Sequence, residues 1–197
     1  MRYDAEHKQQ TRERVLKAAA KAIRADGPHR IGVAAVMAEV GLTHGGFYAH
    51  FESKDAFVAA AVGQMFVESR TRFDQALEGR SPREGLAAYL DFYLSAPHRD
   101  TRTAGCPLPF LSADAPRLAA PSRERFAQGV ANLTARLAEV LGSMGQAEPE
   151  ETAASMLSEM VGAVALARAE PDPVRSDAIL ARTRASLIRR LGLETAQ

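Results

Sequence analysis

The sequence predicts an all-α protein made of two helical domains. Apolar residues recur three and four positions apart along most of the chain, which is the spacing that lines one face of a helix. Strand-like alternation of apolar and polar residues is absent, and no hairpin-type turn joins two strand-like runs. With 197 residues, of which 46% are apolar, the chain can bury a substantial core, and its length suits one or two small domains.

Turn and capping residues divide the N-terminal part into short helices. The first helix is expected over about 7–25, where an Asp-Gly-Pro sequence ends it. A second is expected over 33–40, because Gly41 supplies the left-handed residue that ends a helix. A third is expected over 44–51, and the hydroxyl of Thr43 can cap its first turn.

Longer helices are expected in the remainder of the chain. Ser53 can cap one of them, and residues 81–84 read Ser-Pro-Arg-Glu, a capping box with proline at the first helical position. Pro97 is expected to end the helix that begins there. Further helices are expected around Phe110, over 122–144, from Pro149 to Ala169, and from beyond Pro173 to about Leu191.

Positive charge is concentrated near the N-terminus, although the net charge is only +1. Residues 1–55 carry nine Lys and Arg against seven Asp and Glu, together with four of the five histidines. Such an excess is compatible with a polyanionic partner, although a merely solvated surface has a similar composition. The charge distribution alone therefore leaves both interpretations open.

The composition argues against several classes of protein. No apolar run reaches the roughly eighteen residues of a membrane span, and the polar start differs from a secretion signal. A single cysteine, Cys106, excludes an internal disulfide framework, and the histidines lack the spacing of a zinc site. We therefore expect a cytoplasmic protein with no metal and no cofactor.

The N-terminal helices match a helix-turn-helix motif. Two short helices joined by a glycine-containing turn are the arrangement in which the second helix enters the major groove of DNA. Residues 36–55, VMAEVGLTHGGFYAHFESKD, resemble the TetR/AcrR family of bacterial regulators. The resemblance covers residues 8–68 by motif and implies a DNA-binding domain there, with the helix-turn-helix at about 32–51. It further implies that residues 78–193 form a regulatory, ligand-binding and dimerisation domain.

Helical geometry indicates which residues of this motif face DNA. Phe47 and Phe51 lie about 40° apart on an α-helix, so both are expected to face the core. The opposite arc is rich in glycine and alanine, which favours close approach, contact with thymine methyls and readout of DNA shape. The resemblance implies that Tyr48, His50 and Lys54 contact phosphates. The full predicted DNA-contacting set is Thr43, His44, Gly45, Gly46, Tyr48, Ala49, His50 and Lys54.

A C-terminal segment is expected to mediate dimerisation. Residues 160–169 are apolar on every side of a helix except at Arg168, so this helix needs a second covering surface besides its own core. A partner subunit, packed in a four-helix bundle, supplies that surface most simply, and a fully intramolecular core is the alternative. The predicted interface residues are Gly162, Ala163, Ala167, Leu180, Leu187 and Ile188.

The resemblance also implies a small-molecule pocket inside the C-terminal helices. Candidate lining residues are Phe92, Tyr93, Cys106, Phe110, Phe126, Met156 and Met160, each of which could equally be ordinary core. The ligand is not identified by the sequence. The function implied is that of a sequence-specific transcriptional regulator, a dimeric repressor released by a small molecule. A twofold dimer is expected to bind an inverted repeat of operator DNA.

The sequence leaves three other functions to consider: a redox-sensing repressor, an enzyme and a protein-binding adaptor. Cys106 lies near a helix start beside Arg99 and Arg102, which would favour a reactive thiolate and hence a repressor that senses oxidants or electrophiles. An enzyme with Cys106 as nucleophile and His98 as base lacks a visible third group, so no enzymatic activity is expected. A helical adaptor that binds only protein would show no salt-dependent binding to DNA.

Overall fold

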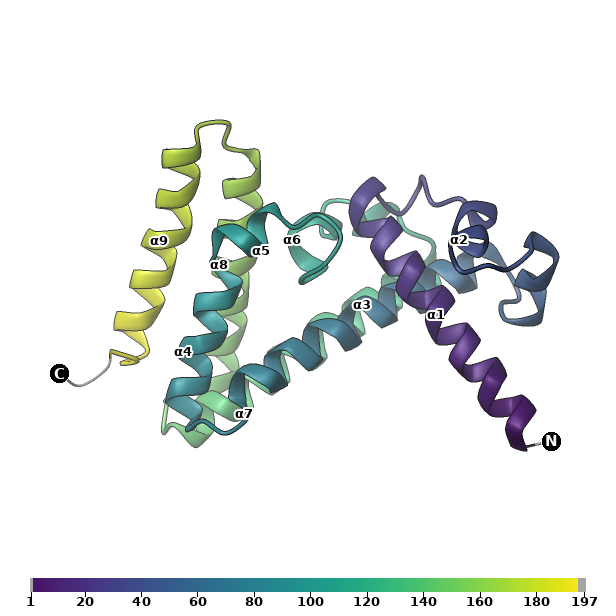
Figure 1. Ribbon diagram of the computed structural model, residues 1–197. Helices are drawn as coiled ribbons and strands as arrows, with labels where there is room; N and C mark the ends of the chain where they lie inside the picture. Colours follow the sequence, from purple (N-terminus) through teal and green to yellow (C-terminus); the bar gives the residue numbers. More distant parts are fainter. Residues whose placement is uncertain (1, 195–197) are drawn as a thin grey trace. The chain divides into compact units, whose positions relative to one another are not determined.

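The computed structural model describes residues 2–194, with side chains described from Glu6 onward, and every regular element in this range is a helix. The all-α prediction is therefore confirmed. The helices are α1 (Arg2–Asp26), α2 (Val33–Glu39), η1 (His44–Ala49), α3 (Lys54–Leu77), α4 (Pro82–Tyr93), α5 (Ala96–Asp100), α6 (Leu108–Leu111), η2 (Ala115–Arg117), α7 (Ala120–Ser143), α8 (Pro149–Ala169) and α9 (Pro173–Arg190) (Figure 1).

Several helix ends form as the capping residues predict. Gly41 has a φ of 76°, the left-handed conformation that ends α2. The Ser53 hydroxyl accepts a hydrogen bond of 3.0 Å from the amide of Ala56 and so caps α3. Ser81 and Glu84 form the expected capping box at the start of α4.

Other local predictions were wrong. Pro97 does not end α4, which stops at Tyr93; Pro97 lies instead in the first turn of α5, where its missing N–H has no helical partner. Thr43 occupies the N-cap position of η1, but its side chain accepts no capping hydrogen bond.

The third helix of the motif is a 3-10 helix, η1, and not an α-helix. Its backbone bonds span three residues, as in the 3.1 Å bond from the Gly46 amide to the Thr43 carbonyl. Two consecutive glycines weaken α-helical propensity, and a segment of six residues is too short to recover it by cooperativity.

The chain divides into two compact units. The first contains the helices up to Glu68 together with Arg102–Gly129, and the second contains Ser69–Thr101 together with the chain from Val130 onward. Residues 102–129 thus belong to the same compact unit as the helix-turn-helix, whereas the sequence assigned them to the C-terminal domain over residues 78–193. The physical reason is apolar packing, since Leu111, Ala115 and Leu118 are buried in the core of the first unit.

The first unit is built around α1. Val15, Ala19 and Ile23 on one face of this helix are completely buried. Two polar contacts hold α2 against it: the Arg14 guanidinium donates to the Val40 carbonyl at 2.9 Å, and Lys21 pairs with Glu39 at 3.4 Å. These contacts fix the position from which the chain enters η1.

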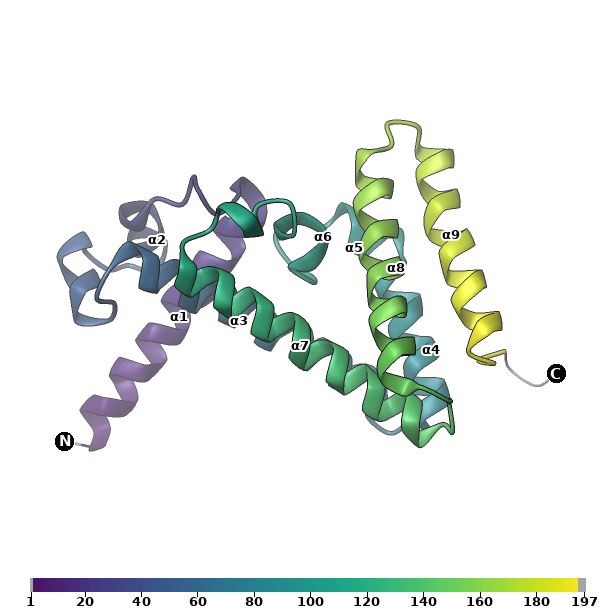
Figure 2. The ribbon, with the colours of Figure 1, turned by 180° about the vertical axis from the view of Figure 1, so that it is seen from behind.

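The second unit packs aromatic residues between its helices. The rings of Phe73 and Tyr89 meet edge to face at 4.6 Å, and Leu137 on α7 and Met160 on α8 are fully buried. Helices α8 and α9 form an antiparallel pair that lies side by side in both views (Figure 2).

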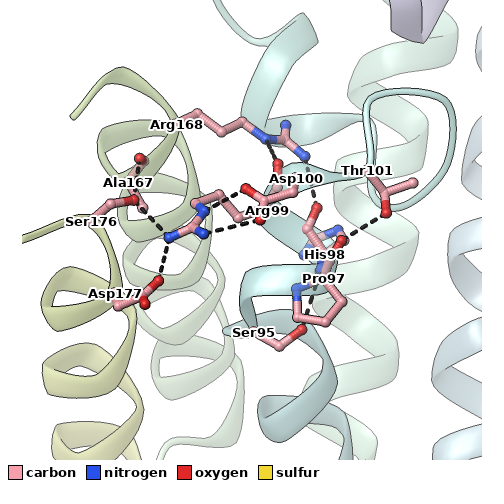
Figure 3. A network of polar contacts seen from close by, with 10 residues as sticks. All are labelled: Ser95, Pro97, His98, Arg99, Asp100, Thr101, Ala167, Arg168, Ser176 and Asp177. Atoms are coloured by element: carbon pink, nitrogen blue, oxygen red, sulfur yellow. Dashed lines mark hydrogen bonds and ion pairs between the residues drawn. The ribbon is translucent and has the colours of Figure 1, made fainter. Parts of the chain in front are cut away.

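A polar network ties α5 to α8 and α9 (Figure 3). Arg168 on α8 donates to the carbonyls of Arg99 and His98 at 2.9 and 3.1 Å, which satisfies acceptors at the C-terminal end of α5. Arg99 in turn binds the Ser176 hydroxyl at 2.8 Å and Asp177 at 2.5 Å, both on α9. Hydrogen bonds to Asp100 and Asp177 raise the pKa of Arg99, so this side chain is a permanent cation.

Candidate nucleic-acid interface

A cluster of three phenylalanines fixes η1 on the start of α3. Phe47 stacks on Phe51 with centroids 5.4 Å apart and meets Phe57 edge to face at 5.4 Å. All three rings are buried, so the expectation that Phe47 and Phe51 face the core is confirmed. The cluster leaves the opposite side of η1 at the surface.

That opposite side presents an exposed tyrosine. Tyr48 is 68% exposed, the edge of its ring is supported by Phe47, and the two centroids lie 5.2 Å apart. Exposure of a large aromatic residue with a free hydroxyl suits a hydrogen bond to a phosphate of a partner. The other predicted contact residues lie beside it: Thr43, His44, Gly45, Ala49 and Lys54 are exposed, and Gly46 and His50 are half-buried.

Nothing inside the chain requires glycine at positions 45 and 46. Neither residue has a positive φ. A Cβ added to Gly45 would meet nothing closer than 4.0 Å, and one added to Gly46 would meet nothing closer than 3.8 Å. The described structure would accommodate alanine at both positions, so neither packing nor backbone conformation requires glycine there.

His50 lies at the edge of this surface in a cationic environment. Burial lowers its pKa, and the charges of Lys8 and Arg12 lower it further, so the ring is neutral near pH 7. Its Nδ1 is enclosed and has no hydrogen-bond partner among the described residues. Lys8 and Arg12 were not among the predicted contact residues; their spacing of four along α1 was the available sequence signal.

The predicted pocket residues are divided between the two units. Cys106, Phe110 and Phe126 belong to the first unit, whereas Phe92, Tyr93, Met156 and Met160 belong to the second. Cys106 is buried, with 3% of its surface exposed, which limits the access of oxidants to its thiol.

The predicted dimer residues differ in accessibility. Ala163, Ala167, Leu180 and Leu187 are buried within the chain's own core, so their side chains are not at the surface. Gly162 and Ile188 are partly exposed, and a Cβ added to Gly162 would meet no atom within 4 Å. The same side of α8 exposes Leu166, which is 63% accessible, and the start of α9 exposes Val174 at 77%.

The described residues include neither a membrane-spanning helix nor a cluster of metal ligands. Within residues 2–194, no helix is both long enough and apolar enough to cross a membrane. The described side chains also include no group of three or more His, Cys, Asp and Glu residues placed to hold a metal ion.

The sequence of the first unit matches a family of regulators. Residues 15–61 match the family model described as bacterial regulatory proteins, tetR family. This range contains the buried face of α1, all of α2 and η1, and the start of α3. No curated protein is similar enough in sequence to count as a match.

Solved structures share the fold along nearly the whole chain. The reduced form of NemR from E. coli has a TM-score of 0.78 at 22% identity, with 91% of this chain and 96% of that chain covered. A TetR transcriptional regulator from Chloroflexus aurantiacus J-10-FL also scores 0.78, at 24% identity, with 95% and 96% covered.

A TetR-family regulator from Cytophaga hutchinsonii scores 0.78 at 20% identity, with 97% of this chain and 98% of that chain covered. At these identities the likeness is one of fold, and the match over residues 15–61 adds the motif. Residues 15–61 therefore carry the motif of the tetR family of bacterial regulatory proteins, within a fold that these solved regulators share along nearly the whole chain.

Proposed function

We propose that the protein is a dimeric, cytoplasmic repressor that binds an inverted repeat of operator DNA and is released by a small molecule. The observation that carries DNA binding is the outer face of η1. There an exposed Tyr48 stands beside two glycines that neither the backbone nor the packing of the chain requires. Such a face can approach base edges closely while Tyr48, His50 and Lys54 hold phosphates.

DNA binding is tested with a fluorescent duplex carrying the sequence upstream of the protein's own gene. Wild-type protein should bind with an affinity that falls steeply with salt, because phosphate contacts release counterions. Lys54→Ala should weaken binding to every sequence alike and reduce the salt slope by about one unit, and Tyr48→Phe should weaken binding uniformly. A change in base preference with an unchanged slope would assign Lys54 a different role.

The composition of η1 also predicts how the operator is recognised. Because Gly45, Gly46 and Ala49 carry no hydrogen-bonding side chain, contacts with thymine methyls and DNA shape should dominate. Single mismatches should cost about 1 kcal/mol, the low end of the usual range. Replacing thymine by uracil in the half-sites should weaken binding. If binding ignores the methyl but collapses on changing one guanine, a polar side chain reads the sequence.

The proposed dimer face is the exposed side of α8 and the start of α9. Gly162 and Leu166 lie one turn apart on α8, and small exposed residues, Ser158 and Ala169, extend the same face. Small residues permit close approach of two helices, and Leu166 with Val174 offers apolar surface to cover. This face replaces Ala163, Ala167, Leu180 and Leu187 as the proposed direct contact.

Sedimentation velocity tests the dimer. Gly162→Glu should convert a dimer into a monomer with unchanged helix content, and operator binding should be lost because one half-site is too weak. Ala135→Glu, on an exposed position of α7, is the matched control and should remain dimeric. A wild-type monomer at micromolar concentration would refute the dimer.

A further inference from the structure

The N-terminal turns of α1 carry cations where its buried face would continue. Val15, Ala19 and Ile23 form the buried stripe of this helix. Counting back at the same spacing of three and four residues reaches Arg12 and Lys8, which therefore lie on the same side of α1. Both views show these first turns extending past α2 (Figures 1 and 2). The side of α1 that is buried further along the helix is therefore charged in its first turns.

These two cations lie beside the end of η1. The guanidinium carbon of Arg12 is 4.9 Å from the centroid of the Phe51 ring, a cation–π contact that orients the side chain. The charges of Lys8 and Arg12 both act on the neighbouring His50, and no carboxylate is among the groups that shift its pKa. Among the described side chains, Lys8 and Arg12 of α1 thus place positive charge near His50, and no carboxylate offsets it there.

Other cations of the same helix do have protein partners. Lys21 pairs with Glu39 at 3.4 Å, and Arg24 pairs with Glu68 at 2.7 Å. Among the side chains that the structure describes, neither Lys8 nor Arg12 forms an ion pair. Clustered like charges repel one another unless an anion joins them. The cluster therefore has the composition of an anion site whose counter-charge comes from another molecule.

We propose that Lys8, Arg12 and His50 form a second phosphate subsite, which takes a phosphodiester of duplex DNA next to the one contacted by Tyr48 and Lys54. This inference rests on the proposed function, because DNA presents a row of phosphates to both places. His50 follows Tyr48 by two residues, directly after the end of η1, so the two subsites are close along the chain. Lys8 and Arg12 act as charges and fix orientation, with no role in base selection.

The test uses full-length protein and a fluorescent mixed-sequence duplex of about thirty base pairs, with affinity measured by anisotropy between about 50 and 200 mM salt. Lys8→Gln and Arg12→Gln should each weaken binding about tenfold at the low-salt end and lower the salt slope by about one unit. Lys17→Gln is the matched control, because Lys17 is exposed on the opposite face of α1. It should leave the slope unchanged.

Two further variants separate charge from folding. Arg12→Lys keeps the charge and should retain the wild-type slope, whereas loss of the slope in Arg12→Lys would mean that the Phe51 contact alone matters. Lys8→Gln removes no aromatic contact, and its circular dichroism should match that of the wild type. An equal loss of slope in Lys17→Gln would overturn the subsite in favour of diffuse surface charge.

The two proposals fail in different ways. If Lys54→Ala lowers the slope while Lys8→Gln and Arg12→Gln do not, the second subsite is refuted and DNA binding stands. If the wild-type protein shows no salt-dependent binding to the duplex or to its upstream DNA, both are refuted.

Discussion

Gly129 on α7 lies directly against the ring of Phe66 on α3, so closely that a Cβ at position 129 would overlap the ring atoms. The ring of Phe126, one turn earlier on α7, meets Phe66 edge to face at 5.8 Å. Glycine is therefore required at this point of the first unit, where the two helices touch.

Gly129→Ala should destabilise the protein by about 1 to 3 kcal/mol, because overpacking forces Phe66 from its position. Gly142→Ala in the same helix is the control, since its Cβ would meet nothing closer than 3.8 Å and alanine favours a helix. Denaturant titration of both variants measures the difference. An equal stability of the two would show that Phe66 moves aside without cost.

Glu68→Gln should destabilise the protein by about 2 to 3 kcal/mol, because among the described residues Glu68 is the carboxylate that pairs with the buried Arg24 guanidinium, at 2.7 Å. The side chain of Arg24 is 3% exposed, and its Nε and one terminal nitrogen already lack partners among the described residues. The one-third exposure of Glu68 keeps the expected cost below that of a fully buried pair.

Glu39→Gln is the matched control for this ion pair. It breaks the exposed Lys21–Glu39 pair, which also joins α1 to another helix, and should cost less than about 1 kcal/mol. Thermal unfolding compares the two variants. If Glu39→Gln costs as much as Glu68→Gln, burial of the Arg24 guanidinium does not decide the energy.

Stability should fall as the pH falls below about 6.5, the ordinary pKa of histidine. Burial lowers the pKa of His98, and the charges of Arg168 and Arg72 act in the same direction, against the hydrogen bond to the Tyr93 carbonyl. Because the folded pKa lies below the unfolded one, protonation favours unfolding, and the stability present at neutral pH is lost as the pH falls through the folded value.

His98→Gln tests this pH dependence. The variant should be less stable than the wild type at pH 7, because it loses ring packing against Tyr93, but its stability should fall less between about pH 7 and about pH 5. Denaturant titrations at a series of pH values give both slopes. His50 contributes to each slope equally, so identical slopes would exclude His98 as a source.

Arg168→Met should loosen α5 by removing the donors to the carbonyls of His98 and Arg99, at a cost of about 1 to 3 kcal/mol. Hydrogen exchange of the amides in residues 96–101 should accelerate. Arg175→Met, which breaks only an exposed pair with Glu170, is the control and should leave that exchange unchanged. Unaltered exchange in Arg168→Met would mean that α5 is held by apolar packing alone.

The sequence predicted the long elements well because their signals are local. The capping box at Ser81 and the left-handed Gly41 each depend on a few adjacent residues, and both form as expected. Pro97 was misplaced because proline ends one helix and begins another with equal ease, and only the packing of α5 decides between them.

Contacts between residues far apart in the sequence could not be predicted from local patterns. Buried Ala163 and Leu187 carry the same apolar signal as a dimer face, because a sequence does not tell which side of a doubly apolar helix meets its own core. The cluster of Lys8 and Arg12 with His50 joins residues about forty positions apart, and the Phe51 ring that orients Arg12 became visible only in the folded chain.

The first unit is assembled from two separate stretches of chain, and this has a consequence for biosynthesis and for gene fusion. Leu111, Ala115 and Leu118 complete the core that begins with α1, so the DNA-binding half remains unfinished until the ribosome has translated well past the middle of the gene. A fragment ending at Glu68 would expose that core. A fusion of the helix-turn-helix unit to another protein therefore has to include residues 102–129 as well as the N-terminal helices. Such a fusion needs two chain junctions.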